Sequence, residues 1–105
     1  MGFLNAVFGI GTNKETITNL VKEGAFLVDV RSGVEFSGGH VKGSVNIPLD
    51  QIPSQLTKFK GKEHIIVFCR SGMRSSQAKS ILELNGFKNV TNGGTWQTIN
   101  TIVQK

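Results

Sequence analysis

The sequence predicts one domain of the α/β class, built in three layers with a central, mostly parallel sheet flanked by helices. Two patterns carry this prediction. Short apolar runs without polar alternation are typical of strands in parallel sheets, which are covered on both faces. These runs alternate along the chain with segments whose apolar residues recur at helical spacing, as in α/β proteins. At 105 residues, the chain is long enough to form a core without crosslinks.

We expect the chain to divide into a leader or short helix at 1–11 and the domain itself at 12–105. The leader MGFLNAVFGIG is apolar, but it lacks the basic region and the cleavage site of a signal peptide. We expect it to pack on the domain. No stretch approaches the ~20 apolar residues that a membrane span needs, so no membrane partner is expected and a cytoplasmic location follows by default.

The first half of the domain contains helical and strand signals in alternation. Thr12 and Glu15 have the spacing of a capping box, so a helix should begin there and end at Gly24. The segments that follow are a buried strand at 25–30, a short helical turn at 34–36 and a second, brief strand at 44–49.

The second half continues the alternation. A helical set of apolar residues spans 49–59 and is interrupted near its start by Pro53. The run 64–69 is apolar on both faces and is the clearest strand. The remaining predicted segments are a helix at 75–84, a strand at 87–91, a turn at Gly93-Gly94 and a last helix at 96–103.

Composition argues against several classes of function. The net charge is +5, yet only Lys58, Lys60 and Lys62 cluster, and without interleaved aromatic residues a nucleic-acid surface is not expected. One cysteine cannot form an intramolecular disulfide. Together with His40 and His64 it does not compose a zinc site, so no metal and no cofactor are expected. No long apolar stripe marks an interface, which favours a monomer.

The only cysteine, Cys69, ends the clearest strand, where ligand sites of open α/β sheets are found. The segment between it and the next helix should present backbone N–H groups to an anion, and Gly72 permits a tight curve there. Arg70 and Arg74 add positive charge, which lowers the pKa of a thiol and favours the nucleophilic thiolate. A cysteine at a strand end can also be simple packing. The arginines, the glycine and the helix start together favour the reactive interpretation.

The motifs LVDVR, EFSGGHVKGSVNIPL and VFCRSGMRSSQA together resemble a single-domain rhodanese, a thiosulfate sulfurtransferase. The resemblance extends from Thr12 to Trp96. It implies a rhodanese-like domain in which Cys69 is the nucleophile that accepts sulfur. The implied substrate cradle consists of Arg70, Ser71, Gly72, Met73 and Arg74. Four further residues match positions that mainly support the loops around such a site, namely Asp29, Arg31, Glu35 and His40.

The resemblance also implies a reaction. The Cys69 thiolate attacks the outer sulfur of thiosulfate, sulfite departs, and cyanide or a thiol then removes the sulfur from the Cys69 persulfide. The implied partners are a small anionic sulfur donor, a thiol or cyanide acceptor, and a sulfur-relay protein. The chain departs from the family after Gly93-Gly94, where Trp96 follows sooner than is usual, so the course of the last helix stays open.

Two other functions are compatible with a reactive Cys69. One is a persulfide carrier that partner proteins load and unload at the same site. The other is a cysteine phosphatase or arsenate reductase, whose Cys–Arg loop binds phosphate-like anions. Those enzymes share a C-x5-R spacing, whereas Arg74 produces C-x4-R and the next position is Ser75. The tighter loop is better suited to a single sulfur atom than to a tetrahedral centre.

Overall fold

The computed structural model describes residues 13–105, so the leader expected at 1–11 and Thr12 lie outside the described residues. Four parallel strands form one sheet in the order β2-β1-β3-β4. Their bounds are Phe26–Asp29 for β1, Val45–Asn46 for β2, Ile65–Cys69 for β3 and Val90–Thr95 for β4. The predicted α/β class with a central parallel sheet is confirmed.

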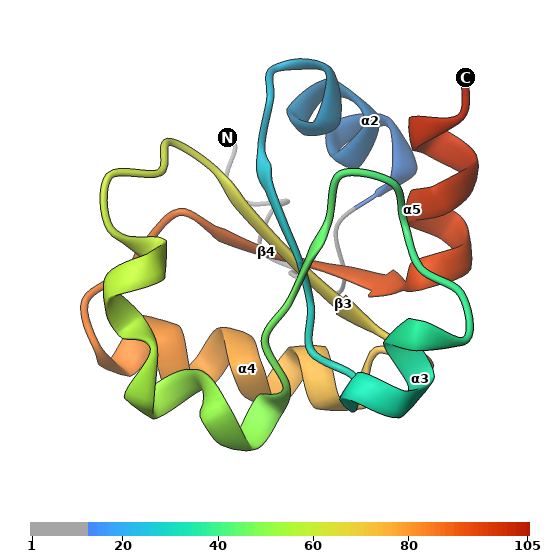
Figure 1. Ribbon diagram of the computed structural model, residues 1–105. Helices are drawn as coiled ribbons and strands as arrows, with labels where there is room; N and C mark the ends of the chain where they lie inside the picture. Colours follow the sequence, from blue (N-terminus) through green and yellow to red (C-terminus); the bar gives the residue numbers. More distant parts are fainter. Residues whose placement is uncertain (1–12) are drawn as a thin grey trace.

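Helices cover both faces of the sheet (Figure 1). The helices α2 (Lys14–Lys22) and α5 (Trp96–Val103) lie on one face. The other face carries α4 (Met73–Leu84) and two 3-10 helices, η1 (Leu49–Ser54) and η2 (Leu56–Phe59). The short helix α3 (Gly33–Ser37) lies beyond the end of the sheet where β3 leads into α4 (Figure 1). None of the helices in residues 13–105 has the length and apolar character needed to cross a lipid bilayer.

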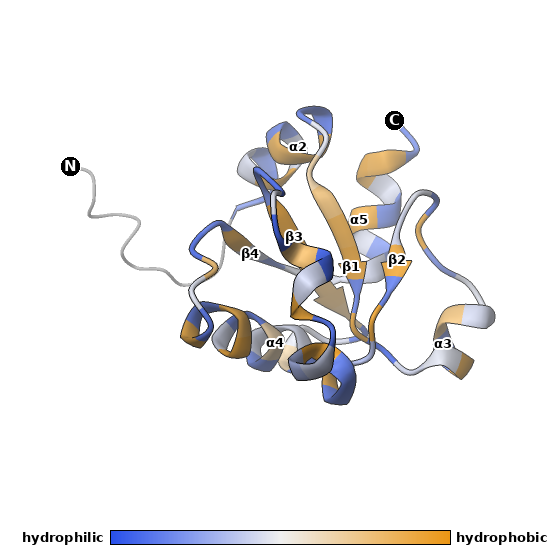
Figure 2. Ribbon diagram, turned by 60° about the vertical axis from the view of Figure 1, so that its left-hand side comes forward, coloured by the Kyte–Doolittle hydropathy of each residue, from blue (hydrophilic) through white to orange (hydrophobic). Residues whose placement is uncertain are grey.

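The core consists of two apolar clusters, one on each face of the sheet, because successive strand residues point to opposite faces. In β3, Ile65 and Val67 belong to the cluster under α4, while Ile66 and Phe68 belong to the cluster under α2 and α5. All of β3 is buried, which explains its continuous apolar sequence. Figure 2 shows the strands as a mainly hydrophobic layer between helices with hydrophilic outer residues.

The helix α2 begins at Lys14 rather than at the predicted capping box. Its N-cap is Asn13, whose side chain accepts a hydrogen bond from the Thr16 N–H at 2.8 Å. Asparagine caps a helix at least as well as threonine, so Asn13 takes the role that was predicted for Thr12. The helix ends as predicted, since Gly24 adopts a φ of +87°.

The segment 49–59 forms the two 3-10 helices instead of one regular helix. Pro53 lies inside η1 and has no N–H to donate, and Gln55 interrupts the helical conformation with a φ of −125°. Ile52 and Phe59 nevertheless face the core, as the spacing of the apolar residues predicted.

The strand β4 differs most from the prediction. It begins at Val90 and runs through Gly93-Gly94, where a turn was expected. Its pairing with β3 contains a register shift: Val67 lies opposite Asn92, whereas Phe68 lies opposite Gly94. This shift is a β-bulge, in which one strand carries an extra residue.

Close packing explains why the bulge contains glycines. A Cβ on Gly93 would lie 2.8 Å from Ile66 Cγ2 and 2.9 Å from Ile99 Cδ1. Gly94 adopts a φ of +81°, a conformation that glycine adopts without steric cost. The paired glycines therefore let the strand continue against α5. The last helix follows directly as α5 at the predicted residues, Trp96–Val103.

Candidate active site

Cys69 is the last residue of β3, and residues 70–72 connect it to the first turn of α4. The connection and α3 lie at the same end of the sheet (Figure 1). The helix α4 starts at Met73, two residues earlier than predicted, because Gly72 acts as its N-cap with a φ of +95°. This positive φ turns the chain sharply and brings the Gly72 N–H back toward the cysteine.

The Cys69 sulfur is surrounded by hydrogen-bond donors. The Gly72 N–H donates to Sγ at 3.0 Å, and the Ser75 hydroxyl oxygen lies 3.5 Å from Sγ. Burial raises the pKa of the Cys69 thiol. Hydrogen-bonding contacts with the Ser75 side chain and with the backbone of Ser75, Ser71 and Gly72 lower this pKa, and their combined effect is the larger one. The net pKa is below that of an ordinary cysteine, so the thiolate forms at a lower pH than it does in an ordinary cysteine.

Cys69 is nevertheless fully covered, with 0% of its surface exposed. It packs in the α4-side cluster with Val30 and Ala78. Burial alone would fit the packing interpretation of this cysteine, but simple packing does not account for an N–H that points at the sulfur. Residues 70 and 71 are exposed, and Met73 is 74% exposed. A substrate can therefore contact the sulfur only after a change from this conformation, and we expect the adjoining segment 70–72, called the covering segment below, to move.

Arg74 forms a bidentate ion pair with Glu35, at 2.8 and 3.1 Å. The hydrogen bond from Arg74, together with one from the Ser32 backbone, lowers the pKa of Glu35 to about 2. In turn, the hydrogen bond to Glu35 raises the pKa of Arg74. Glu35 also completes a capping box with Ser32 at the start of α3. The pair thus ties α3 to α4, and the predicted contact of Arg74 with a substrate stays a prediction.

Asp29 and Arg31 form a buried ion pair at the end of β1. The Arg31 Nη2 donates to Asp29 Oδ2 at 2.7 Å and to the Gly39 carbonyl oxygen at 2.7 Å. The guanidinium also lies 4.6 Å from the ring centroid of Trp96. Arg31 therefore joins the strand end, the loop after α3 and the first residue of α5, and its supporting role in the site stays a prediction.

His40 lies in the loop after α3 and is exposed. Its Nδ1 lies 2.9 Å from the Phe36 carbonyl oxygen, and its ring stacks on the Phe36 ring with centroids 3.9 Å apart. These contacts anchor the loop locally, and the supporting role of His40 stays a prediction.

Two polar residues near Cys69 were not assigned to the site from the sequence. Ser75 is fully buried on α4, and its hydroxyl donates to Asn92 Oδ1 at 2.7 Å. Ser75, Ala78 and Leu82 are the buried residues of α4, spaced at helical intervals. The sequence contained one signal for this polar contact. A serine occupies the first of these core positions, and a buried hydroxyl requires a polar partner.

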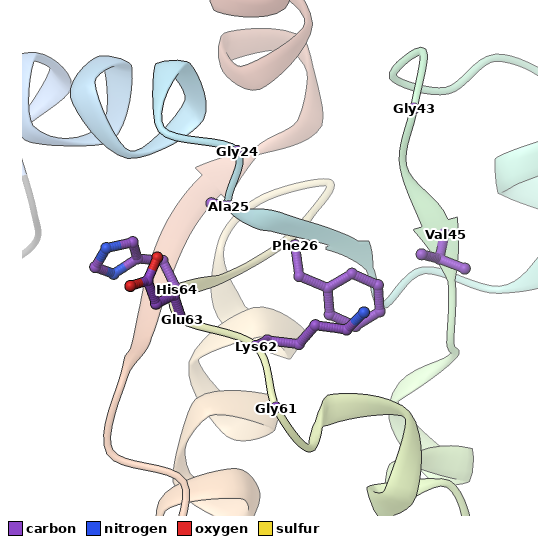
Figure 3. A pocket seen from close by; sticks show the side chains of 9 residues that line it. All are labelled: Gly24, Ala25, Phe26, Gly43, Val45, Gly61, Lys62, Glu63 and His64. Carbon is purple, nitrogen blue, oxygen red and sulfur yellow. The ribbon is translucent and has the colours of Figure 1, made fainter.

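One hollow of the described surface lies away from the site, and another adjoins it. A hollow of about 470 Å³ lies at the opposite ends of β1 and β3, where the Lys62 ammonium sits 4.6 Å from the centroid of the Phe26 ring (Figure 3). Its lining contains no part of residues 69–75, so we do not connect it with Cys69. A smaller hollow of about 200 Å³ adjoins Arg74, Ser32 and Leu49. Within residues 13–105, no group of three or more His, Cys, Asp or Glu side chains could hold a metal ion.

Comparison with known proteins decides the family. The model of the rhodanese-like domain matches residues 12–94. The chain belongs to the rhodanese-like domain family. This rhodanese-like chain is 36% identical over 69 residues to the thiosulfate sulfurtransferase PspE of Escherichia coli, covering 64% of the chain and 66% of PspE. It is 31% identical over 70 residues to a sulfurtransferase of Allochromatium vinosum, covering 67% of the chain and 65% of that protein.

Solved structures agree with this assignment. A rhodanese with anions from E. coli matches with a TM-score of 0.65 and 30% identity, over 70% of the rhodanese-like chain and 89% of that chain. The chain spans only 54% and 36% of the length of two Bacillus subtilis relatives. Membership of the family supports sulfur transfer in general as the chemistry of this site.

Proposed function

We propose that this chain is a sulfurtransferase that moves a sulfane sulfur from thiosulfate, or from a persulfide or polysulfide donor, to a thiol or cyanide. The single observation that carries the proposal is the Gly72 N–H that donates to the Cys69 sulfur at 3.0 Å. A hydrogen bond to the charged form favours it, and the thiolate is the nucleophilic form of cysteine. The named sulfurtransferases among the relatives add independent support.

The proposed cycle has two balanced steps. The Cys69 thiolate attacks the outer sulfur of thiosulfate, the sulfur–sulfur bond breaks, and sulfite leaves with the bonding electron pair. The terminal sulfur of the resulting persulfide carries the negative charge, which the N–H groups of the loop stabilise. Cyanide or a thiolate then attacks that sulfur, and the Cys69 thiolate leaves and is regenerated.

The loop residues supply the proposed anion cradle. The exposed Arg70 offers a positive charge, and the first turn of α4, starting at Met73, offers free N–H groups and the positive end of its dipole. Arg74 offers a guanidinium whose charge is shared with Glu35. Movement of the segment 70–72, which is exposed at residues 70 and 71, would admit the donor to the covered sulfur.

Intact-mass measurement after exposure to thiosulfate tests this function. We expect the wild-type chain to gain one sulfur atom and to lose it again when cyanide is added. Cys69→Ala removes the only thiol and should gain nothing, and Cys69→Ser, which keeps the size of the side chain, should behave in the same way. A wild-type chain without the adduct, or an equal adduct on Cys69→Ala, would rule the proposal out.

The covered sulfur favours a second candidate function, a persulfide carrier loaded by a partner protein. A docked partner could hold the covering segment open, whereas a small donor must wait for it to move. Steady-state turnover with thiosulfate and cyanide separates the two functions. Slow turnover combined with rapid persulfide formation from a cysteine desulfurase would favour the carrier, and rapid turnover would favour the enzyme.

A further inference from the structure

The side chain of Asn92 connects three segments around Cys69. Its Oδ1 accepts hydrogen bonds from the Ser75 hydroxyl at 2.7 Å and from the Gly94 N–H at 2.9 Å. Its Nδ2 donates to the Gly72 carbonyl oxygen at 3.3 Å. One amide therefore joins the first turn of α4, the bulge of β4 and the loop that follows Cys69.

The register of the sheet explains why Asn92 reaches this position. Asn92 lies opposite Val67, and both Val67 and Cys69 face α4. The next residue, Gly93, faces the other cluster, because its Cβ position is close to Ile66 and Ile99. Since successive residues alternate between faces, Asn92 shares the α4 face of the sheet with Cys69.

The loop after Cys69 is held through the backbone of Gly72, because glycine has no side chain that could make a contact. Gly72 adopts a positive φ, and the position of its absent Cβ lies 3.6 Å from Gly94 Cα, so the loop packs directly on the bulge. Its carbonyl accepts from the Ser76 N–H at 3.1 Å as well as from Asn92. Its N–H is the one that donates to the Cys69 sulfur.

Ser75 is fixed by the same amide. Its hydroxyl donates its one proton to Asn92 Oδ1 at 2.7 Å, and this contact fixes the hydroxyl oxygen 3.5 Å from Cys69 Sγ. Two pairs of charged groups near the site bind one another, Arg74 of α4 with Glu35 of α3 and Arg31 with Asp29 of β1. Arg70, next to the cysteine in the chain, is exposed. Asn92 therefore acts on the sulfur through the position of uncharged groups.

We propose that Asn92 is a positioning residue of the sulfur-transfer site, which holds the loop after Cys69 through the Gly72 carbonyl oxygen so that the Gly72 N–H stabilises negative charge on Cys69. The role of Asn92 in sulfur transfer rests on the function proposed above. The effect of Asn92 on the reactivity of Cys69 can be measured without any sulfur donor.

The test is the rate at which iodoacetamide alkylates Cys69 as a function of pH, in the wild-type chain and in Asn92→Leu. Leucine has nearly the size of asparagine but makes no hydrogen bond. We expect alkylation of Asn92→Leu to be about fivefold to tenfold slower at neutral pH, because a pKa raised by one unit lowers the thiolate population tenfold. The two rates should converge at high pH, where both cysteines are ionised.

Asn89→Leu is the matched control. Asn89 donates its side-chain N–H groups to the carbonyl oxygens of Lys62 and Glu63, at the opposite end of the sheet from Cys69. Its replacement also removes side-chain amide contacts, so it should lower the free energy of unfolding but leave the alkylation profile unchanged. A purely structural role for Asn92 would make the two variants behave alike.

An unchanged profile in Asn92→Leu, or a rate altered by the same factor at every pH, would overturn the proposal. If Asn92→Leu does not fold, Ser75→Ala removes one partner of the amide and should shift the profile in the same direction by a smaller amount. No shift in Ser75→Ala would then count against the proposal. The thiosulfate adduct on the wild-type chain tests the function separately, since a shifted profile without an adduct refutes only sulfur transfer.

Discussion

At the scale of single residues, uncharged groups stabilise the Cys69 thiolate. The sequence indicated Arg70 and Arg74 as the source of the lowered pKa. The structure instead attributes it to the Ser75 side chain and to the backbone of Ser75, Ser71 and Gly72. The charge of Arg74 is balanced at close range by Glu35, and its interaction with Cys69 is smaller than its interaction with Glu35, whereas the Gly72 N–H donates directly to the sulfur.

The Glu35–Arg74 pair predicts a loss of stability in acid. The pKa of Glu35 is lowered from 4.5 to about 2, so its ion pair stabilises the folded chain above pH 4.5 and this contribution disappears as the pH falls toward 2. The side chains are 30% and 37% exposed, and solvent screening limits the contribution to about 1 kcal/mol. We expect Glu35→Gln to lower the free energy of unfolding by that amount at neutral pH.

Urea unfolding at several pH values checks this prediction. The difference between wild type and Glu35→Gln should shrink as the pH falls from 4.5 to 2, where Glu35 becomes protonated. Lys79 and Glu83 form a pair on the exposed face of α4, and Glu83→Gln is the matched control with a smaller effect. A difference between wild type and Glu35→Gln that stays constant across this pH range would contradict the interpretation.

At the scale of the elements, the bulge of β4 shapes the site. It brings Gly94 against the cysteine loop, and Gly93 lets the strand lie against α5. From the sequence, Gly93-Gly94 predicted a turn, because paired glycines most often occur where the chain reverses. Position 93 requires glycine because Ile66 and Ile99, which lie on other elements, leave no room for a Cβ.

Gly93→Ala should therefore destabilise the fold by about 1–3 kcal/mol, since overpacking a tight core forces its neighbours to shift. The measurement is the free energy of unfolding in urea, followed by circular dichroism. Gly33→Ala is the control, because its Cβ would meet only Asn46 Oδ1 at an ordinary 3.7 Å. Equal stability of the two variants would show that the bulge accommodates a side chain at position 93.

At the scale of the whole molecule, the reactive sulfur is part of the core, so its exposure depends on how the domain opens. Cys69 packs in the cluster formed by β1, β3, α4 and the 3-10 helices, next to the covering segment, whose residues 70 and 71 are exposed. A function in sulfur transfer requires that this segment open locally while the sheet stays folded.

Alkylation of Cys69 in low concentrations of urea distinguishes local from global opening. Global unfolding exposes a large surface and accelerates steeply with urea, whereas local opening of a short loop depends on urea only weakly. We expect a rate that is almost independent of urea below the unfolding transition. A rate that rises with the full urea dependence of unfolding would mean that the sulfur is reached only in the unfolded chain, which would contradict the proposed function.

The sequence by itself determined the class of the fold, the order of the elements and the position of the cysteine at a strand end. These features follow from local patterns: the apolar runs at 25–30 and 64–69, and helical spacing after Cys69. Only the tertiary structure decided that Arg74 binds Glu35, 39 residues away, and that Ser75 binds Asn92. The physical reason is that hydrogen bonds and close packing depend on distances in space between elements, which no local pattern of residues specifies.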